Sequence, residues 1–210
     1  MSILPFVLIA LAQSPADKAI DAAVKAYANI RTAKATFEQT ITNPLIGSKL
    51  NSKGQFEQSR PNRFAFRFTD PKGDVIICDG QHVWAYLPTS APGRVNRARC
   101  GGEGTAALDL IGEFFSNPTA RYTIGDGGTA KVGDKNGHIV LLTPKSKDAA
   151  FVRAKVWIEP TSGSLLQFEA VEQNGLTRLV RITSFSPNAA VNPKAFTFTV
   201  PKGVKVVDMK

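Results

Sequence analysis

The chain has 210 residues, 43% of them hydrophobic and 20% charged, a composition typical of one globular domain with a sizeable core. No stretch reaches the roughly 20 apolar residues that cross a bilayer, which excludes a helical membrane protein. The formal net charge of +9 favours anionic partners, but the chain has no basic helix, zinc-finger spacing or RNP-type aromatic motif, so lipid headgroups rank above nucleic acid.

Residues 1–12 are predicted to be a signal peptide. Ile3 to Leu11 is an apolar run broken only by Pro5, and small residues precede Gln13. Because no Lys or Arg precedes the run, a buried N-terminal strand or helical turn is the alternative. Residues 13–210 are then expected to form a single domain.

A first helix is expected over about Pro15 to Ala33. Ser14 supplies a capping hydroxyl, Pro15 stands at the first helical position and Asp17 lies in the first turn. Apolar residues follow at helical spacing and form one stripe to bury: Ala16, Ile20, Ala23, Val24, Tyr27 and Ile30.

Roughly ten strands with period-two alternation are predicted, and turn pairs separate many of them. Those pairs are Asp79-Gly80, Asn136-Gly137, Asn174-Gly175 and, more weakly, Ser162-Gly163. Sequential hairpins imply an antiparallel meander, which must curl into a barrel or part of one. Gly125 to Ala130 resembles a dinucleotide fingerprint, but another turn follows instead of a helix, so we expect a hairpin loop there.

Basic residues are scattered along the expected strands, and we expect them on one face of the sheet. They are Arg63, Arg67, Arg153, Lys155, Arg178 and Arg181.

A second helix is expected between Thr105 and Ser116. Its wide apolar face contains Ala107, Leu108, Leu110, Ile111, Phe114 and Phe115. Asp109 and Glu113 share the other face, where we expect them to be solvated and not to form an acid/base pair. Two amphipathic helices beside one curved sheet suggest a plugged half-barrel.

Catalytic and metal-binding patterns are missing from the sequence. Only two histidines occur, His82 and His138, and no HExxH, GxSxG or P-loop motif accompanies them. We therefore expect no enzyme, no metal site and no cofactor. Cys78 and Cys100 lack metal-ligand spacing; in an oxidising compartment they form one disulfide, and two unrelated buried thiols are the alternative.

One strand carries three phenylalanines on one face. Phe64, Phe66 and Phe68 alternate with other residues, so period-two geometry places their rings together on the concave side. Plain core packing and a lining for acyl chains both fit this pattern. Under the second interpretation Trp84 or Tyr86 adds to the lining.

Five segments together resemble the LolA family of periplasmic lipoprotein carriers. They are Ala35 to Gln39, Gly54 to Phe56 followed by Arg60 to Phe64, Asp79-Gly80 with Val83 to Tyr86, Phe168 to Gln173, and Phe196 to Val204. The resemblance implies a mainly β protein with an unclosed antiparallel β-barrel and an amphipathic helical lid over an acyl-chain cavity. The expected cavity residues are Ile20, Val24, Phe37, Phe64, Phe66, Phe68, Trp84, Tyr86, Leu108, Ile111, Phe114 and Phe115.

The resemblance also implies a role and partners. Arg60 is expected to latch the lid by binding carbonyls at the end of a lid helix. A monomer in the periplasm would receive triacylated lipoproteins from an inner-membrane lipoprotein-releasing ABC transporter and pass them to an outer-membrane acceptor. The alternative is a membrane-associated lipid-binding or envelope-sensing protein of the same fold.

Overall fold

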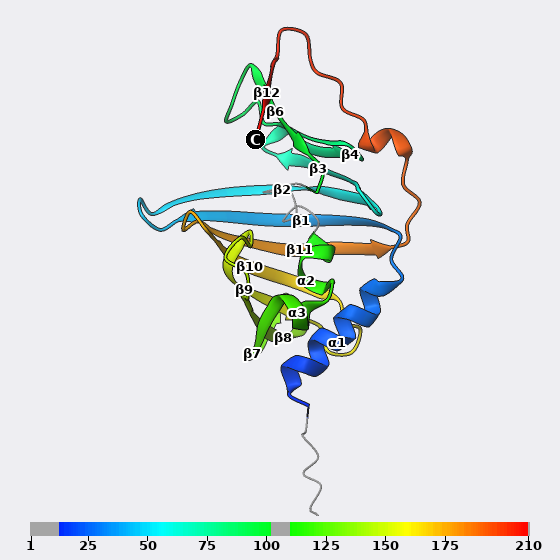
Figure 1. The fold of residues 1–210 in the computed structure, drawn as a ribbon, viewed down its shortest axis with the longest axis vertical. Helices are drawn as coiled ribbons and strands as arrows, with labels where there is room; N and C mark the ends of the chain where they lie inside the picture. Colours follow the sequence, from blue (N-terminus) through cyan, green and yellow to red (C-terminus); the bar gives the residue numbers. More distant parts are fainter. Residues whose placement is uncertain (1–12, 102–109, 210) are drawn as a thin grey trace, which may run out of the picture.

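The structure, a computed structural model, describes residues 13–101 and 110–209 and is dominated by one large curved sheet (Figure 1). Its twelve strands are β1 (Thr32–Asn43), β2 (Ser48–Ser59), β3 (Arg63–Asp70), β4 (Lys72–Asp79), β5 (His82–Tyr86), β6 (Arg94–Arg99), β7 (Tyr122–Val132), β8 (Lys135–Pro144), β9 (Phe151–Ile158), β10 (Leu165–Glu172), β11 (Thr177–Pro187) and β12 (Lys205–Asp208). The helices are α1 (Pro15–Ala28), α2 (Leu110–Phe115), α3 (Pro118–Arg121) and the 3-10 turn η2 (Pro193–Phe196).

The sheet is unclosed, as predicted. Its strand order is β12-β6-β5-β4-β3-β2-β1-β11-β10-β9-β8-β7, and the edge strands β12 and β7 lie at opposite ends of that order. Neighbouring strands pair antiparallel except β12, which pairs parallel with β6. The two meanders β1–β6 and β7–β11 meet where β1 pairs with β11.

Helix α1 packs its apolar stripe against the end of the sheet formed by β7, β8 and β9. It begins as expected, because the Ser14 hydroxyl accepts a hydrogen bond from the Asp17 amide at 3.1 Å. The predicted end at Ala33 is wrong: the helix stops at Ala28, and Ala33 is already in β1. The apolar residues near the end of α1 fit both helical and strand spacing, so periodicity alone did not locate the boundary between α1 and β1.

Two turn predictions in the β7–β8 hairpin are wrong. Gly125 to Ala130 lies inside β7, where an irregularity between Asp126 and Thr129 interrupts the pairing. Asn136 and Gly137 belong to β8, and the turn is formed by Gly133 and Asp134, with Gly133 at a φ of +60°. The glycines thus accommodate a bulge and one tight turn instead of two loops.

The convex face of β3 and β4 is covered by the chain that follows β11. After β11 the chain passes through η2 and rises to β12 at the edge of the sheet (Figure 1). Phe196 of η2 packs with Ala65 and Ile77 in a small core, and Arg67 donates a hydrogen bond to the Ala195 carbonyl at 2.7 Å. No helix among residues 13–101 and 110–209 is long and apolar enough to cross a membrane.

Candidate functional site

The concave face of the sheet contains a mainly apolar cavity of about 310 Å³. This lies at the small end of the roughly 300–1,000 Å³ range of ligand pockets. Aromatic side chains of β1 and β3 form one wall: the ring of Phe37 meets those of Phe66 and Phe68 edge-on, with centroids 5.7 Å away in both cases. The full lining is Phe37, Gln39, Phe66, Phe68, Ile76, Glu113, Phe114, Ala150, Phe151, Phe168, Ala170, Glu172, Arg178 and Val180.

Helix α2 covers this cavity with Phe114. Its ring is 5.1 Å from that of Phe168 and 5.8 Å from that of Phe151, and only 2% of the residue is exposed. The next residue, Phe115, stacks on Tyr27 of α1 at 4.8 Å. Both helices are therefore joined through aromatic rings on the concave side, in the position expected of a lid.

Glu113 fastens α2, contrary to the prediction that it is solvated. It is 6% exposed, and its carboxylate accepts hydrogen bonds from Arg121 at 2.7 Å and from the Tyr122 hydroxyl at 2.9 Å. Burial, together with the Glu113 charge, raises the pKa of Tyr122 well above its usual range. Arg121 also donates hydrogen bonds to the Gly112 and Glu113 carbonyl oxygens of this short helix, at 3.2 and 2.6 Å.

Polar side chains line one end of the cavity. Arg178 of β11 donates to the Glu172 carboxylate and the Gln39 side-chain oxygen, both at 2.8 Å, and Gln39 donates to the Ser52 hydroxyl. The expectation that the basic residues share one face is therefore wrong for Arg178. It lies three residues from Arg181, and period-two alternation places residues three apart on opposite faces.

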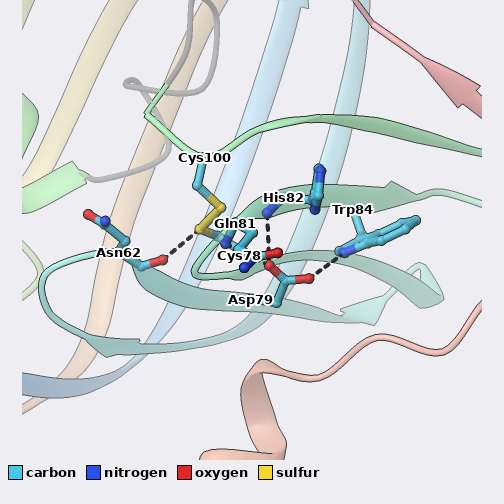
Figure 2. The surroundings of a disulfide bond; sticks show 7 residues. All are labelled: Asn62, Cys78, Asp79, Gln81, His82, Trp84 and Cys100. Carbon is cyan, nitrogen blue, oxygen red and sulfur yellow. Dashed lines mark hydrogen bonds between the residues drawn. A yellow bond between two sulfur atoms is a disulfide. The ribbon is translucent and has the colours of Figure 1, made fainter.

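Trp84 and Tyr86 lie on the convex face, so the prediction that they line the hollow is wrong. Trp84 pairs with Ile77 across β4 and β5, and the rings of Trp84 and Tyr86 pack on Phe198 of the C-terminal segment at 5.6 and 5.9 Å. Asp79 accepts a hydrogen bond from the Trp84 indole at 2.8 Å (Figure 2). Although burial opposes it, this bond and those from the His82 and Gln81 amides lower the pKa of Asp79.

Arg60 reaches the C-terminal end of α1. Its guanidinium donates to the Tyr27 carbonyl oxygen at 3.4 Å, a long hydrogen bond, and the same oxygen accepts from the Ile30 amide at 3.3 Å. The arginine thus meets a helix-end carbonyl, and it does so on α1 rather than on α2. Its role as a latch remains a proposal.

Cys78 and Cys100 form a disulfide (Figure 2). It joins β4 to the residue after β6, and the Cys78 sulfur lies 2.7 Å from the Asn62 carbonyl oxygen. Phe64, which we expected in the acyl-chain cavity, lines a separate cavity of about 280 Å³ beside this disulfide. That cavity also contains Gly112 and Arg121, so the disulfide lies close to the residues that hold α2.

The remaining expected site residues fall into two groups. Ile20 and Val24 of α1 and Phe115 of α2 pack in the concave-side core and do not line the 310 Å³ cavity. Leu108 and the Ile111 side chain lie outside the described residues, as do residues 1–12. Ten of the fourteen lining residues were not predicted. Strand periodicity could have suggested the large apolar ones among them, which face the cavity from other strands of the same sheet: Ile76, Phe151, Phe168 and Val180.

Comparisons with known proteins agree with this architecture. The family described as "Outer membrane lipoprotein carrier protein LolA" matches residues 28–199. Outer-membrane lipoprotein carrier proteins of Methylibium petroleiphilum and Chromobacterium violaceum are each 30% identical to the chain; the matches cover 90% and 92% of this chain and 89% and 90% of theirs.

Solved structures show the same fold at low sequence identity. An uncharacterized conserved protein from Thermus thermophilus superposes with a TM-score of 0.56 at 11% identity, covering 93% of this chain and all of that one. MucB superposes with a TM-score of 0.51 at 14% identity, covering 90% of this chain and 64% of that chain. By the extent of the sequence match, the chain belongs to the LolA family of outer membrane lipoprotein carrier proteins.

Proposed function

We propose that the protein is a periplasmic carrier that encloses the acyl chains of lipoproteins in its concave-face cavity and moves them from the inner to the outer membrane. The observation that carries this proposal is the apolar cavity beneath α2, in a chain of this family. No catalytic step, metal or cofactor is part of the proposed role. Triacylated lipoproteins are the proposed cargo, and an inner-membrane ABC transporter and an outer-membrane acceptor are the proposed partners.

Transfer free energies explain why acyl chains need such a carrier. Each methylene exposed to water costs about 0.8 kcal/mol, so a chain of ~16 carbons would cost on the order of 12 kcal/mol. At this cost, the rate at which an unshielded acyl chain crosses the water layer would be negligible. An enclosed apolar cavity removes most of this cost.

Delivery requires that the cavity does not hold its cargo too tightly. Phe114 fills space between Phe151 and Phe168, so acyl chains that enter would displace it from apolar contacts. The free energy of opening the lid offsets part of the binding free energy, which leaves the cargo transferable. At about 310 Å³ the cavity is small, and we infer that it enlarges when α2 moves.

The experiment is to purify the exported protein from a periplasmic extract and to identify its bound molecules by mass spectrometry. We expect triacylated protein. Ile76→Gln places an amide in the cavity and should reduce the bound cargo, whereas Val75→Gln changes the adjacent residue, which packs on the other face, and should not. Free phospholipid alone would favour a lipid shuttle, and equal cargo on both variants would contradict the cavity assignment.

A further inference from the structure

Two large apolar residues stand exposed at the end of the β1–β2 hairpin. Leu45 is 86% exposed and Ile46 is 75% exposed, and Leu50 on the adjoining part of β2 is exposed as well. The hairpin reaches farther than the neighbouring turns on that side of the sheet (Figure 1). Adjacent exposed aliphatic side chains on a projecting turn suggest a contact outside the molecule.

The turn itself does not need these two side chains. The Asn43 side chain accepts a hydrogen bond from the Leu45 amide at 3.0 Å, and Gly47 takes the left-handed backbone conformation with φ of +66°. Asn, Pro and Gly are the residues that favour such turns, and this turn contains one of each: Asn43, Pro44 and Gly47. Leucine and isoleucine at the two central positions therefore contribute nothing to turn formation.

The charges near the turn suit an anionic surface. From Gln39 to Phe56 the chain has two lysines, Lys49 and Lys53, and no Asp or Glu, and Lys53 pairs with Glu38 at 3.7 Å. Lys49 is exposed beside the apolar pair. Apolar side chains next to a lysine favour the headgroup region of a membrane, where the aliphatic groups are buried and the ammonium group meets anionic lipid.

We propose that the hairpin tip, defined as Leu45, Ile46 and Lys49, inserts into the headgroup region of a bilayer that contains anionic phospholipid. A specific protein interface buries about 800 Å² per partner with matched shape, which two side chains on a projecting turn do not offer. A fluid bilayer requires no matched surface. Lipid is therefore the occupant that this tip fits.

Insertion would bring the cavity close to the membrane. Gln39, at the polar end of the cavity, lies on β1 only four residues before Asn43, on the order of 13 Å along the strand. An extended acyl chain spans a comparable length. Docking by the tip thus places the cavity within reach of a lipid-anchored cargo at the bilayer surface.

The test is flotation of the exported protein with vesicles that contain only lipid. Vesicles of phosphatidylethanolamine and phosphatidylglycerol supply anionic headgroups, and vesicles of phosphatidylcholine supply none. The variant Leu45→Ser/Ile46→Ser removes the apolar pair and keeps Asn43 and Gly47. Met209→Ser is the matched control, since it removes an exposed apolar side chain next to β12, at the far edge of the sheet.

We expect the wild type and Met209→Ser to float with anionic vesicles and to bind phosphatidylcholine vesicles less. The tip variant should bind about ten-fold or more weakly, since each aliphatic side chain adds to partitioning. Every protein carries the same N-terminus, so the difference reports on the tip. Equal flotation of tip variant and wild type, or no flotation of the wild type, would overturn the proposal. Because the vesicles contain no lipoprotein, the flotation result does not depend on whether the cavity binds lipoprotein cargo.

Discussion

The carboxylate of Glu113 and the guanidinium of Arg121 form an ion pair of 2.7 Å beneath the lid helix α2. Because Glu113 is buried and Arg121 is partly exposed, the pair lies at the border between cavity and solvent. The same arginine holds two carbonyls of α2, so one side chain links the position of the helix to the start of β7.

Replacing Glu113 by Gln should loosen α2. The substitution removes a charge-assisted hydrogen bond from Arg121, and we expect a loss of about 1–3 kcal/mol in the free energy of unfolding. Urea denaturation measures it. Glu38→Gln is the control, because Glu38 forms an exposed pair with Lys53 at 3.7 Å and should change stability by less than about 0.5 kcal/mol. Similar losses in both variants would contradict the role of the buried pair.

Replacing Arg60 by Leu should impair release of cargo more than loading. The variant loses the hydrogen bond to the Tyr27 carbonyl, which makes the closed lid less stable. The population of the open, cargo-bound state therefore rises relative to the closed state. We expect normal or increased acyl-chain binding and a transfer rate to acceptor vesicles lowered by about ten-fold, the effect of 1.4 kcal/mol. Arg63→Leu, on the adjoining strand, is the control. A normal transfer rate for Arg60→Leu would disprove the latch.

Removing the disulfide should destabilise the fold without abolishing it. The half-cystines are 22 residues apart, and a loop of this length corresponds to about 3 kcal/mol of stabilisation. We expect Cys78→Ser/Cys100→Ser to lose about that amount in urea unfolding. Reductant should lower the stability of the wild type similarly and leave the double variant unchanged. A wild type insensitive to reductant would argue against the bond in the exported protein.

Tyr27 should make stability dependent on alkaline pH. Burial raises the pKa of Tyr27 to about 12, although the hydrogen bond from the Leu165 amide opposes the shift. Since the pKa is higher in the folded than in the unfolded chain, this stabilisation is complete below about pH 10 and is lost as pH rises toward 12.

The variant Tyr27→Phe tests this dependence. At about pH 8 it should be less stable than the wild type by about 1–3 kcal/mol, because the buried Leu165 amide loses its acceptor. This difference in the free energy of unfolding should become smaller as pH rises from about 10. Urea unfolding of both proteins at several pH values measures it. A gap that stays constant over this range would show that Tyr27 does not ionise with a raised pKa.

Gly54 should be intolerant of a side chain. A Cβ there would lie 2.7 Å from both the Phe37 ring and the Arg67 carbonyl oxygen. We expect Gly54→Ala to lose about 1–3 kcal/mol in urea unfolding and to bind acyl chains less well, since Phe37 lines the cavity. Gly125→Ala, whose Cβ would meet Leu141 at an ordinary 3.4 Å, should change little. Equal stability of both variants would contradict the close packing at Phe37.

Local patterns predicted the strands and much of the concave face. Alternation placed Phe66 and Phe68 at the cavity because residues two apart in a strand must share a face. It did not place Trp84, because alternation separates two faces without showing which is concave. That depends on the C-terminal segment with Phe198, more than 100 residues later in the sequence.

The sequence did not reveal contacts between residues of different elements, nor which of two neighbouring turn pairs forms the turn. The helical pattern placed Glu113 opposite the apolar face, but its partner Arg121 lies in another helix, so periodicity cannot detect the pair. Gly133-Asp134 and Asn136-Gly137 are both suitable turn pairs, and the pairing of β7 with β8 decided between them. The acyl-binding roles of the cavity residues remain predictions.

The pairing of β1 with β11 has a consequence for how the chain acquires its structure. Ala33 pairs with Pro187, so the centre of the sheet forms only after nearly the whole polypeptide has emerged. Contacts so far apart in sequence make folding slow, because a long loop must close before they form. Until then the meander β1–β6 would present its phenylalanines to water. The β1–β6 meander is therefore the part of the chain most exposed to aggregation before β11 has been made.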